Sequence, residues 1–185
     1  MDSTATNKLK SLRLIICIVI SILIFSLLLW NHFHGGVPSH HLLDQKDLPS
    51  ISNWWSGLLL PILSWILLSR IKERIEKQSS SDVEFRLMMK KVLTLFIIGL
   101  AFGIMLSVSF NTGFKPFLDN VIYILLVMSL ILPIFFSEFM LGFVLGMTYT
   151  FGSILPTAFI IIISTIGFLL YRFIRPLIIK VFFKK

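Results

Sequence analysis

The chain has 185 residues, of which 56% are hydrophobic and only 14% are charged. Soluble domains average about 45–50% apolar and about 25% charged residues, so this composition excludes a soluble protein and predicts an all-α integral membrane protein. A chain of this length has no room for a soluble domain beside its membrane segments, and we expect a single transmembrane helical domain over residues 1–185. The single cysteine excludes an internal disulfide and a cysteine-based metal site.

The net charge of +8 is distributed unevenly along the chain. Fifteen of the 17 Lys and Arg residues lie in residues 8–13, 70–91 and 172–185. Short loops rich in Lys and Arg remain on the cytoplasmic side of a membrane, so we expect both termini and the charged segment 70–90 in the cytoplasm. Membrane topology thus explains the positive charge, and we expect the lipid bilayer, with no nucleic acid, as the partner.

Hydrophobic runs predict a bundle of about six transmembrane segments. A helix needs about 20 apolar residues to cross roughly 30 Å of hydrocarbon. A single span after Glu138 would leave the basic C-terminal tail outside, so we expect a chain reversal near Phe151-Gly152-Ser153 and a fifth segment that is short or re-entrant. The predicted segments are 12–30, 53–69, 91–110, 118–137, 139–152 and 155–172.

Residues 70–90 are too charged to cross a membrane, but their spacing is helical. Glu73 and Lys77 are four positions apart, in the order that favours a helical ion pair, which predicts that the second membrane helix continues into the cytoplasm. Ser81 and Glu84 form a capping-box pattern. We therefore expect the next helix to begin there.

Two pairs of glycines are spaced so that both members lie on one face of a helix. They are Gly99 with Gly103 and Gly142 with Gly146. Small residues at this spacing let two membrane helices approach closely. We expect the two faces to meet each other, or to hold a second copy of the chain or a partner membrane protein.

The segment between the first two membrane helices, residues 31–52, is histidine-rich and is expected on the extracytoplasmic side. Gly35, Gly36 and Pro38 make it turn. Imidazole and carboxylate ligands suit a divalent transition metal such as zinc or nickel, although the spacing matches no standard zinc pattern. The candidate metal ligands are His32, His34, His40 and His41, with Asp44 and Asp47 supplying charge.

Other uses of the same residues stay open. A histidine oriented by Asp44 or Asp47 would serve as a general base toward water or the Ser39 hydroxyl. An ordinary hydrated loop, with histidines and tryptophans at the headgroups, is the simplest alternative. Asn53 begins the second membrane segment and is a further polar candidate. Glu138 is a candidate inner relay, because ionisable groups within membranes are usually functional, or it lies at the cytoplasmic interface.

From these features we expect a transport or sensing protein for a cation or small polar ligand. One alternative is a membrane-embedded hydrolase or transferase, metal-dependent or not, that acts on lipid at the outer leaflet. Another is a structural or accessory subunit of a membrane complex. The small size and the lack of any Asn-x-Ser/Thr sequence favour the bacterial inner membrane as its location.

Overall fold

The computed structural model describes residues 3–41 and 50–182, and it confirms the all-α class, with one small β-hairpin. Within these residues, four helices are long and apolar enough to cross a membrane, which marks an integral membrane protein. The chain divides into two compact units, Met1–Thr94 with Phe151–Leu155 and Leu95–Thr150 with Pro156–Lys185. The four helices are Thr6–Phe33, Trp55–Gln78, Asp82–Thr112 and Ile154–Lys180.

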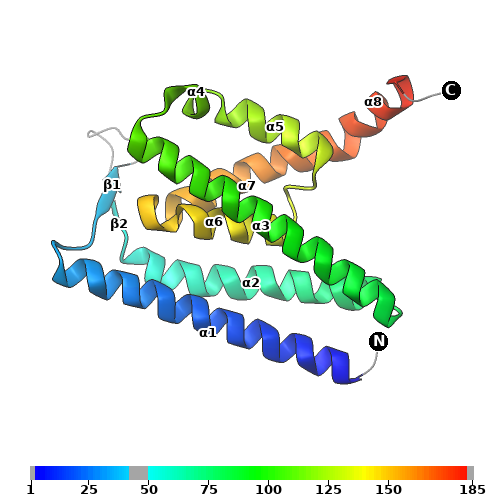
Figure 1. Cartoon of the computed structure of the whole chain (residues 1–185), viewed down its shortest axis with the longest axis horizontal. Helices are drawn as coiled ribbons and strands as arrows, with labels where there is room; N and C mark the ends of the chain where they lie inside the picture. The colour runs from blue at the N-terminus through cyan, green and yellow to red at the C-terminus, as the bar shows by residue number, and fades with distance from the viewer. Residues whose placement is uncertain (1–2, 42–49, 183–185) are drawn as a thin grey trace. The chain divides into compact units, whose positions relative to one another are not determined.

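In the first unit, α1 (Ser3–Phe33) and α2 (Trp55–Gln78) lie side by side and run in opposite directions (Figure 1). Gly57 of α2 permits close contact, because a Cβ atom there would lie 3.0 Å from Leu28 and 3.2 Å from Phe25 of α1. A two-stranded antiparallel hairpin, β1 (Ser39–His41) and β2 (Ser50–Ser52), belongs to the connection between the two helices.

Two predictions for the charged segment 70–90 are confirmed: the second membrane helix continues into it, and the next helix begins within it. α2 extends to Gln78, and α3 (Asp82–Thr112) begins with the expected capping box. The Ser81 N–H donates to Glu84 at 3.2 Å, while the Glu84 N–H donates to the Ser81 hydroxyl at 3.3 Å. The expected ion pair was wrong in register: in the described residues Lys72 pairs with Glu76, at 2.9 Å, instead of Glu73 with Lys77.

The second unit contains α3 from Leu95 onward and the elements that follow it, except Phe151–Leu155 at the turn between α6 and α7, which belong to the first unit. α5 is shorter than the predicted segment 118–137 and ends before Pro133. Proline has no N–H and pushes the preceding residue out of helical geometry, and Leu132 is extended, with φ −114° and ψ 143°. The elements are α4 (Lys115–Leu118), α5 (Val121–Ile131), α6 (Ser137–Phe151), α7 (Ile154–Leu169), the π-helical turn η2 (Leu170–Ile174) and α8 (Arg175–Phe182).

The two glycine faces meet within the chain, which confirms that expectation. A Cβ atom on Gly99 would overlap the carbonyl oxygen of Phe139, and one on Gly103 would lie 2.5 Å from that of Phe143. The contact is reciprocal, because a Cβ on Gly146 of α6 would lie 2.6 Å from the carbonyl oxygen of Leu100. Gly99 meets Phe139 and Gly103, four residues later, meets Phe143, also four residues later. α3 and α6 therefore run in the same direction. A partner that used either face would have to displace the other.

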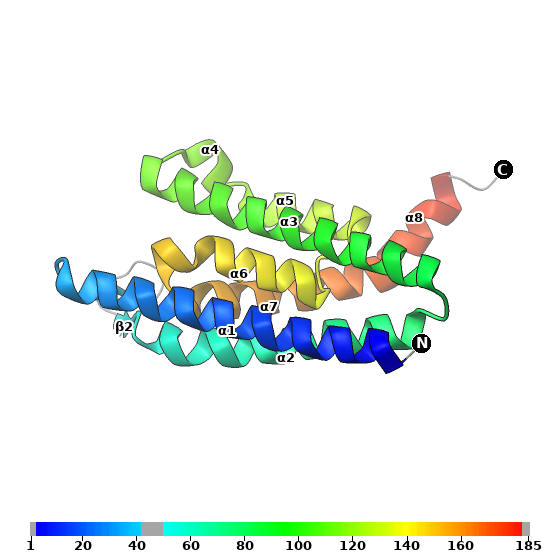
Figure 2. The same ribbon diagram turned by 60° about the horizontal axis from the view of Figure 1, so that its bottom comes forward.

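The predicted chain reversal near Phe151-Gly152-Ser153 is present. α6 ends at Phe151, Gly152 adopts a φ of +69°, and α7 begins at Ile154. α6 and α7 then run side by side in opposite directions (Figure 2), with the rings of Phe143 and Phe159 stacked at 5.9 Å.

Candidate functional site

The connection between α1 and α2 begins with a glycine-dependent helix end. Gly35 and Gly36 have φ values of 112° and 94°, which favour glycine. The Gly36 N–H donates to the Asn31 carbonyl oxygen at 2.9 Å, and this contact closes the end of α1. Beyond the hairpin, the Asn53 N–H donates to the Pro38 carbonyl oxygen at 3.0 Å. We call residues 31–41 and 50–57 the outer cap, after the extracytoplasmic side on which the sequence predicts them.

His34 is oriented by contacts with Trp30. The two rings stack, with centroids 3.9 Å apart and an interplanar angle of 14°. The Nδ1 atom of His34 lies 2.9 Å from the Trp30 carbonyl oxygen. Because a carbonyl oxygen only accepts hydrogen bonds, Nδ1 carries the proton in this contact, and in the neutral ring the lone pair is left on Nε2. Metal-binding histidines commonly have this arrangement, in which the second nitrogen donates to a carbonyl group.

His32 lies on a different side of the same helix end, since residues two apart in a helix point about 200° apart. Its ring contacts Phe33 and Trp54 edge-on, with centroids 5.2 and 5.9 Å away. The contact with Trp54 joins the end of α1 to the start of α2. His32 and His34 are therefore held by aromatic neighbours and are not brought together on one face.

Three further candidates lie on strand β1. Ser39 pairs with Ser52, His40 with Ile51 and His41 with Ser50 in an antiparallel register. For His40 and His41 the structure describes the backbone alone, and Asp44 and Asp47 lie outside the described residues. The four-histidine, two-aspartate site thus stays a prediction. Where side chains are described, no three His, Cys, Asp or Glu residues gather closely enough to hold a metal.

Buried polar contacts hold the base of the outer cap. Asn53 is 7% exposed and Ser56 is 2% exposed. The Ser56 hydroxyl accepts a hydrogen bond from the Ser153 N–H at 2.8 Å. At Gly152 a Cβ atom would overlap the Asn53 Oδ1 atom. The turn between α6 and α7 is therefore fitted against the first turn of α2.

Glu138 is buried, with 1% of its surface exposed, in the first turn of α6. The N-terminus of a helix carries a partial positive charge that favours a carboxylate. This placement is compatible with a structural role for Glu138 as well as with the predicted relay.

Comparison of the chain with known protein families, curated proteins and solved structures finds no match. The contact that sequence reasoning missed is Ser56 with Ser153. Neither residue belongs to a motif, and the only local signal was the glycine between Phe151 and Ser153, which marked a turn without indicating what it touches.

Proposed function

We propose that the protein recognises a cation, most simply a divalent transition metal, at the outer cap, as part of a transport or sensing function. The observation that carries the proposal is the geometry of His34. Its Nδ1 proton is directed to the Trp30 carbonyl oxygen, so Nε2 is the basic nitrogen that a cation would bind. His40 and His41 follow on the paired strand β1, within the same short connection.

The topology that we propose for this function has six membrane segments with both termini in the cytoplasm. The directions in which α1, α2 and α7 run support this topology. The start of α2 and the turn between α6 and α7 touch through Ser56 and Ser153, so both belong on the same side of the membrane. If α1 leaves the basic cytoplasmic side, that side is the outer one. α7 then returns the basic tail, residues 172–185, to the cytoplasm, as the positive-inside rule requires.

Two of the six segments are short for a membrane crossing. At 1.5 Å per residue, α5 with 11 residues and α6 with 15 extend for about 17 and 23 Å, compared with a hydrocarbon core of about 30 Å. We therefore keep the proposal that the fifth segment is short or re-entrant. A short or re-entrant segment is tolerated at membrane depth where protein covers it, and α6 packs closely on α3 along the face that carries Gly142 and Gly146.

The contact between the cap and the α6–α7 turn suggests how binding would be transmitted. A cation bound by the histidines of the cap would draw these residues together. The movement would reach Asn53 and Ser56, because His32 contacts Trp54, which lies between them in the sequence. Asn53 and Ser56 hold Gly152 and Ser153. Binding at the cap would therefore change how firmly the turn between α6 and α7 is held.

We also propose a bacterial inner membrane as the location of the protein, because the chain is small and lacks Asn-x-Ser/Thr glycosylation sequences.

Titration calorimetry with zinc or nickel tests the proposal. We expect His34→Ala to weaken binding more than about tenfold, because the loss of even a second-shell partner costs about 10–100-fold. Val37→Ala is the matched control, since it alters the same cap without removing a ligand atom. Unchanged affinity in His34→Ala, or equal weakening in Val37→Ala, would contradict a role for His34 in binding.

A further inference from the structure

An open groove of about 440 Å³ runs along the outward face of α1. It extends from Leu14 to Leu29, and Trp65 of α2 closes one side. Fifteen helical steps correspond to about 22 Å, and one leaflet supplies about half of the 30 Å hydrocarbon thickness. The groove is therefore longer than one leaflet is deep, so it can hold one acyl chain of a lipid over the full depth of that leaflet.

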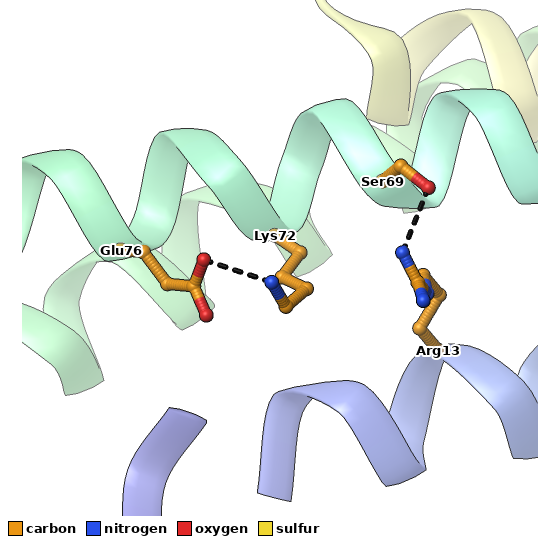
Figure 3. Close-up of polar contacts among 4 residues, drawn as sticks. All are labelled: Arg13, Ser69, Lys72 and Glu76. Carbon is orange, nitrogen blue, oxygen red and sulfur yellow. Dashed lines mark hydrogen bonds and ion pairs between the residues drawn. The ribbon is translucent and has the colours of Figure 1, made fainter. Parts of the chain in front are cut away.

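The end of this groove nearest the N-terminus holds a fixed positive charge. The Arg13 guanidinium lies over the Trp65 ring, 3.9 Å from its centroid. Its Nη1 atom donates to the Ser69 hydroxyl at 3.0 Å (Figure 3). The Ser69 hydroxyl in turn donates to the Trp65 carbonyl oxygen at 2.6 Å. The guanidinium is thus positioned by neutral groups that leave its charge uncompensated.

A second cation shares the stripe that lines the groove. Lys10 and Leu14 are four residues apart, as are Arg13 and Cys17, so the four residues follow one face of α1. Lys10 is exposed. Within the described part of the chain, no carboxylate lies within ion-pair distance of Lys10 or Arg13, whereas Lys72 on α2 is paired with Glu76. Two unneutralised cations therefore meet an apolar groove at its end.

We propose that this place binds one anionic phospholipid, with its phosphate at Lys10 and Arg13 and one acyl chain in the groove. Basic residues just beside a membrane helix attract anionic headgroups, and the planar guanidinium matches the oxygens of a phosphate. In the proposed topology the lipid belongs to the cytoplasmic leaflet. The site lies at the opposite end of α1 from the outer cap and does not depend on cation binding there.

Native mass spectrometry of the detergent-solubilised protein tests the proposal, with phosphatidylglycerol or phosphatidylcholine of the same acyl chains added. We expect the protein to retain one phosphatidylglycerol in preference to phosphatidylcholine. Arg13→Gln should weaken retention about fivefold or more, the effect of losing one basic contact with an anionic lipid. Lys10→Gln should act in the same direction, and because Lys10 is exposed, this variant separates headgroup binding from folding.

Variants in the groove test where the acyl chain lies. Ser21→Phe fills the groove and should abolish retention. Among the residues that the structure describes, the Ser21 hydroxyl bonds to the Cys17 carbonyl oxygen of its own helix, at 2.8 Å, and to no other helix, so its loss breaks no described contact between helices. Val19→Phe adds the same ring to a 48% exposed position outside the groove. Arg86→Gln removes an exposed charge from the start of α3. Both controls should bind as the parent does.

Several results would overturn the proposal. Equal retention of the two lipids would exclude headgroup recognition, and equal weakening in Arg86→Gln would indicate diffuse attraction by the whole basic surface. Retention by Ser21→Phe would place the chain elsewhere. A dimer that forms as the lipid leaves, and that Ser21→Phe disrupts, would assign the groove to a second copy of the protein.

Discussion

The Ser56 hydroxyl accepts a hydrogen bond from the Ser153 N–H at 2.8 Å, although 97 positions separate the two residues. Both residues are buried, with 2% and 0% of their surfaces exposed. The bond joins the first turn of α2 to the turn between α6 and α7. The proposed link between the outer cap and the α6–α7 hairpin depends on it.

Ser56→Ala removes the acceptor and leaves the buried Ser153 N–H without this partner. A buried donor that loses its acceptor costs about 1–3 kcal/mol, so we expect the free energy of unfolding in detergent to fall by about this amount. Ser80→Ala is the control, because Ser80 is exposed and bonds Glu84 through its backbone N–H. If the two variants were equally stable, the Ser56–Ser153 bond would contribute nothing.

Gly152 and Gly113 offer a matched comparison of backbone strain and side-chain contact. Both have a φ of +69°. An added Cβ meets nothing within 4 Å at Gly113, whereas at Gly152 it overlaps the Asn53 Oδ1 atom. We expect Gly113→Ala to cost about 1–2 kcal/mol, the price of left-handed backbone for a side chain, and Gly152→Ala to cost more. Equal losses in thermal unfolding would argue against tight docking of the turn.

The glycine contact between α3 and α6 predicts a graded effect of alanine. At Gly99 an added Cβ meets the backbone of Phe139, whereas at Gly167 it meets side chains, 3.1 Å from Ser129 and 3.2 Å from Ile134. Overpacking typically costs about 1–3 kcal/mol. Because side chains adjust more easily than a helix backbone, we expect Gly99→Ala to destabilise the protein more than Gly167→Ala in denaturant titrations. The reverse order would contradict the close packing.

Features that depend on local spacing could be predicted from the sequence. The glycine faces follow from helical periodicity, and the Ser81–Glu84 capping box needs only four consecutive residues. Local spacing was less decisive for the ion pair, because Lys72 with Glu76 and Glu73 with Lys77 share the same separation. In the structure Lys72 pairs with Glu76. Which pair forms depends on where the side chains of α2 point, and packing decides that direction.

Features that depend on distant contacts could not be predicted. Nothing near Ser56 indicates that its partner is Ser153, because the contact forms only once α6 and α7 reverse direction. The predicted histidine site shows a similar limit. Its composition was visible in the sequence, but the stacking of His34 on Trp30 and the edge contact of His32 with Trp54 depend on how α1 ends. The length of α5 was overestimated because hydrophobicity continues past Pro133 while the helix does not.

The most direct test of the proposed histidine site is elemental analysis of the purified protein by mass spectrometry. Parent protein, Val37→Ala and the double variant His40→Ala/His41→Ala would be prepared identically, without chelators. We predict a near-stoichiometric divalent transition metal in the first two proteins and its loss in the double variant. Absence of metal from the parent protein, or equal metal in the double variant, would contradict a cation site at the outer cap.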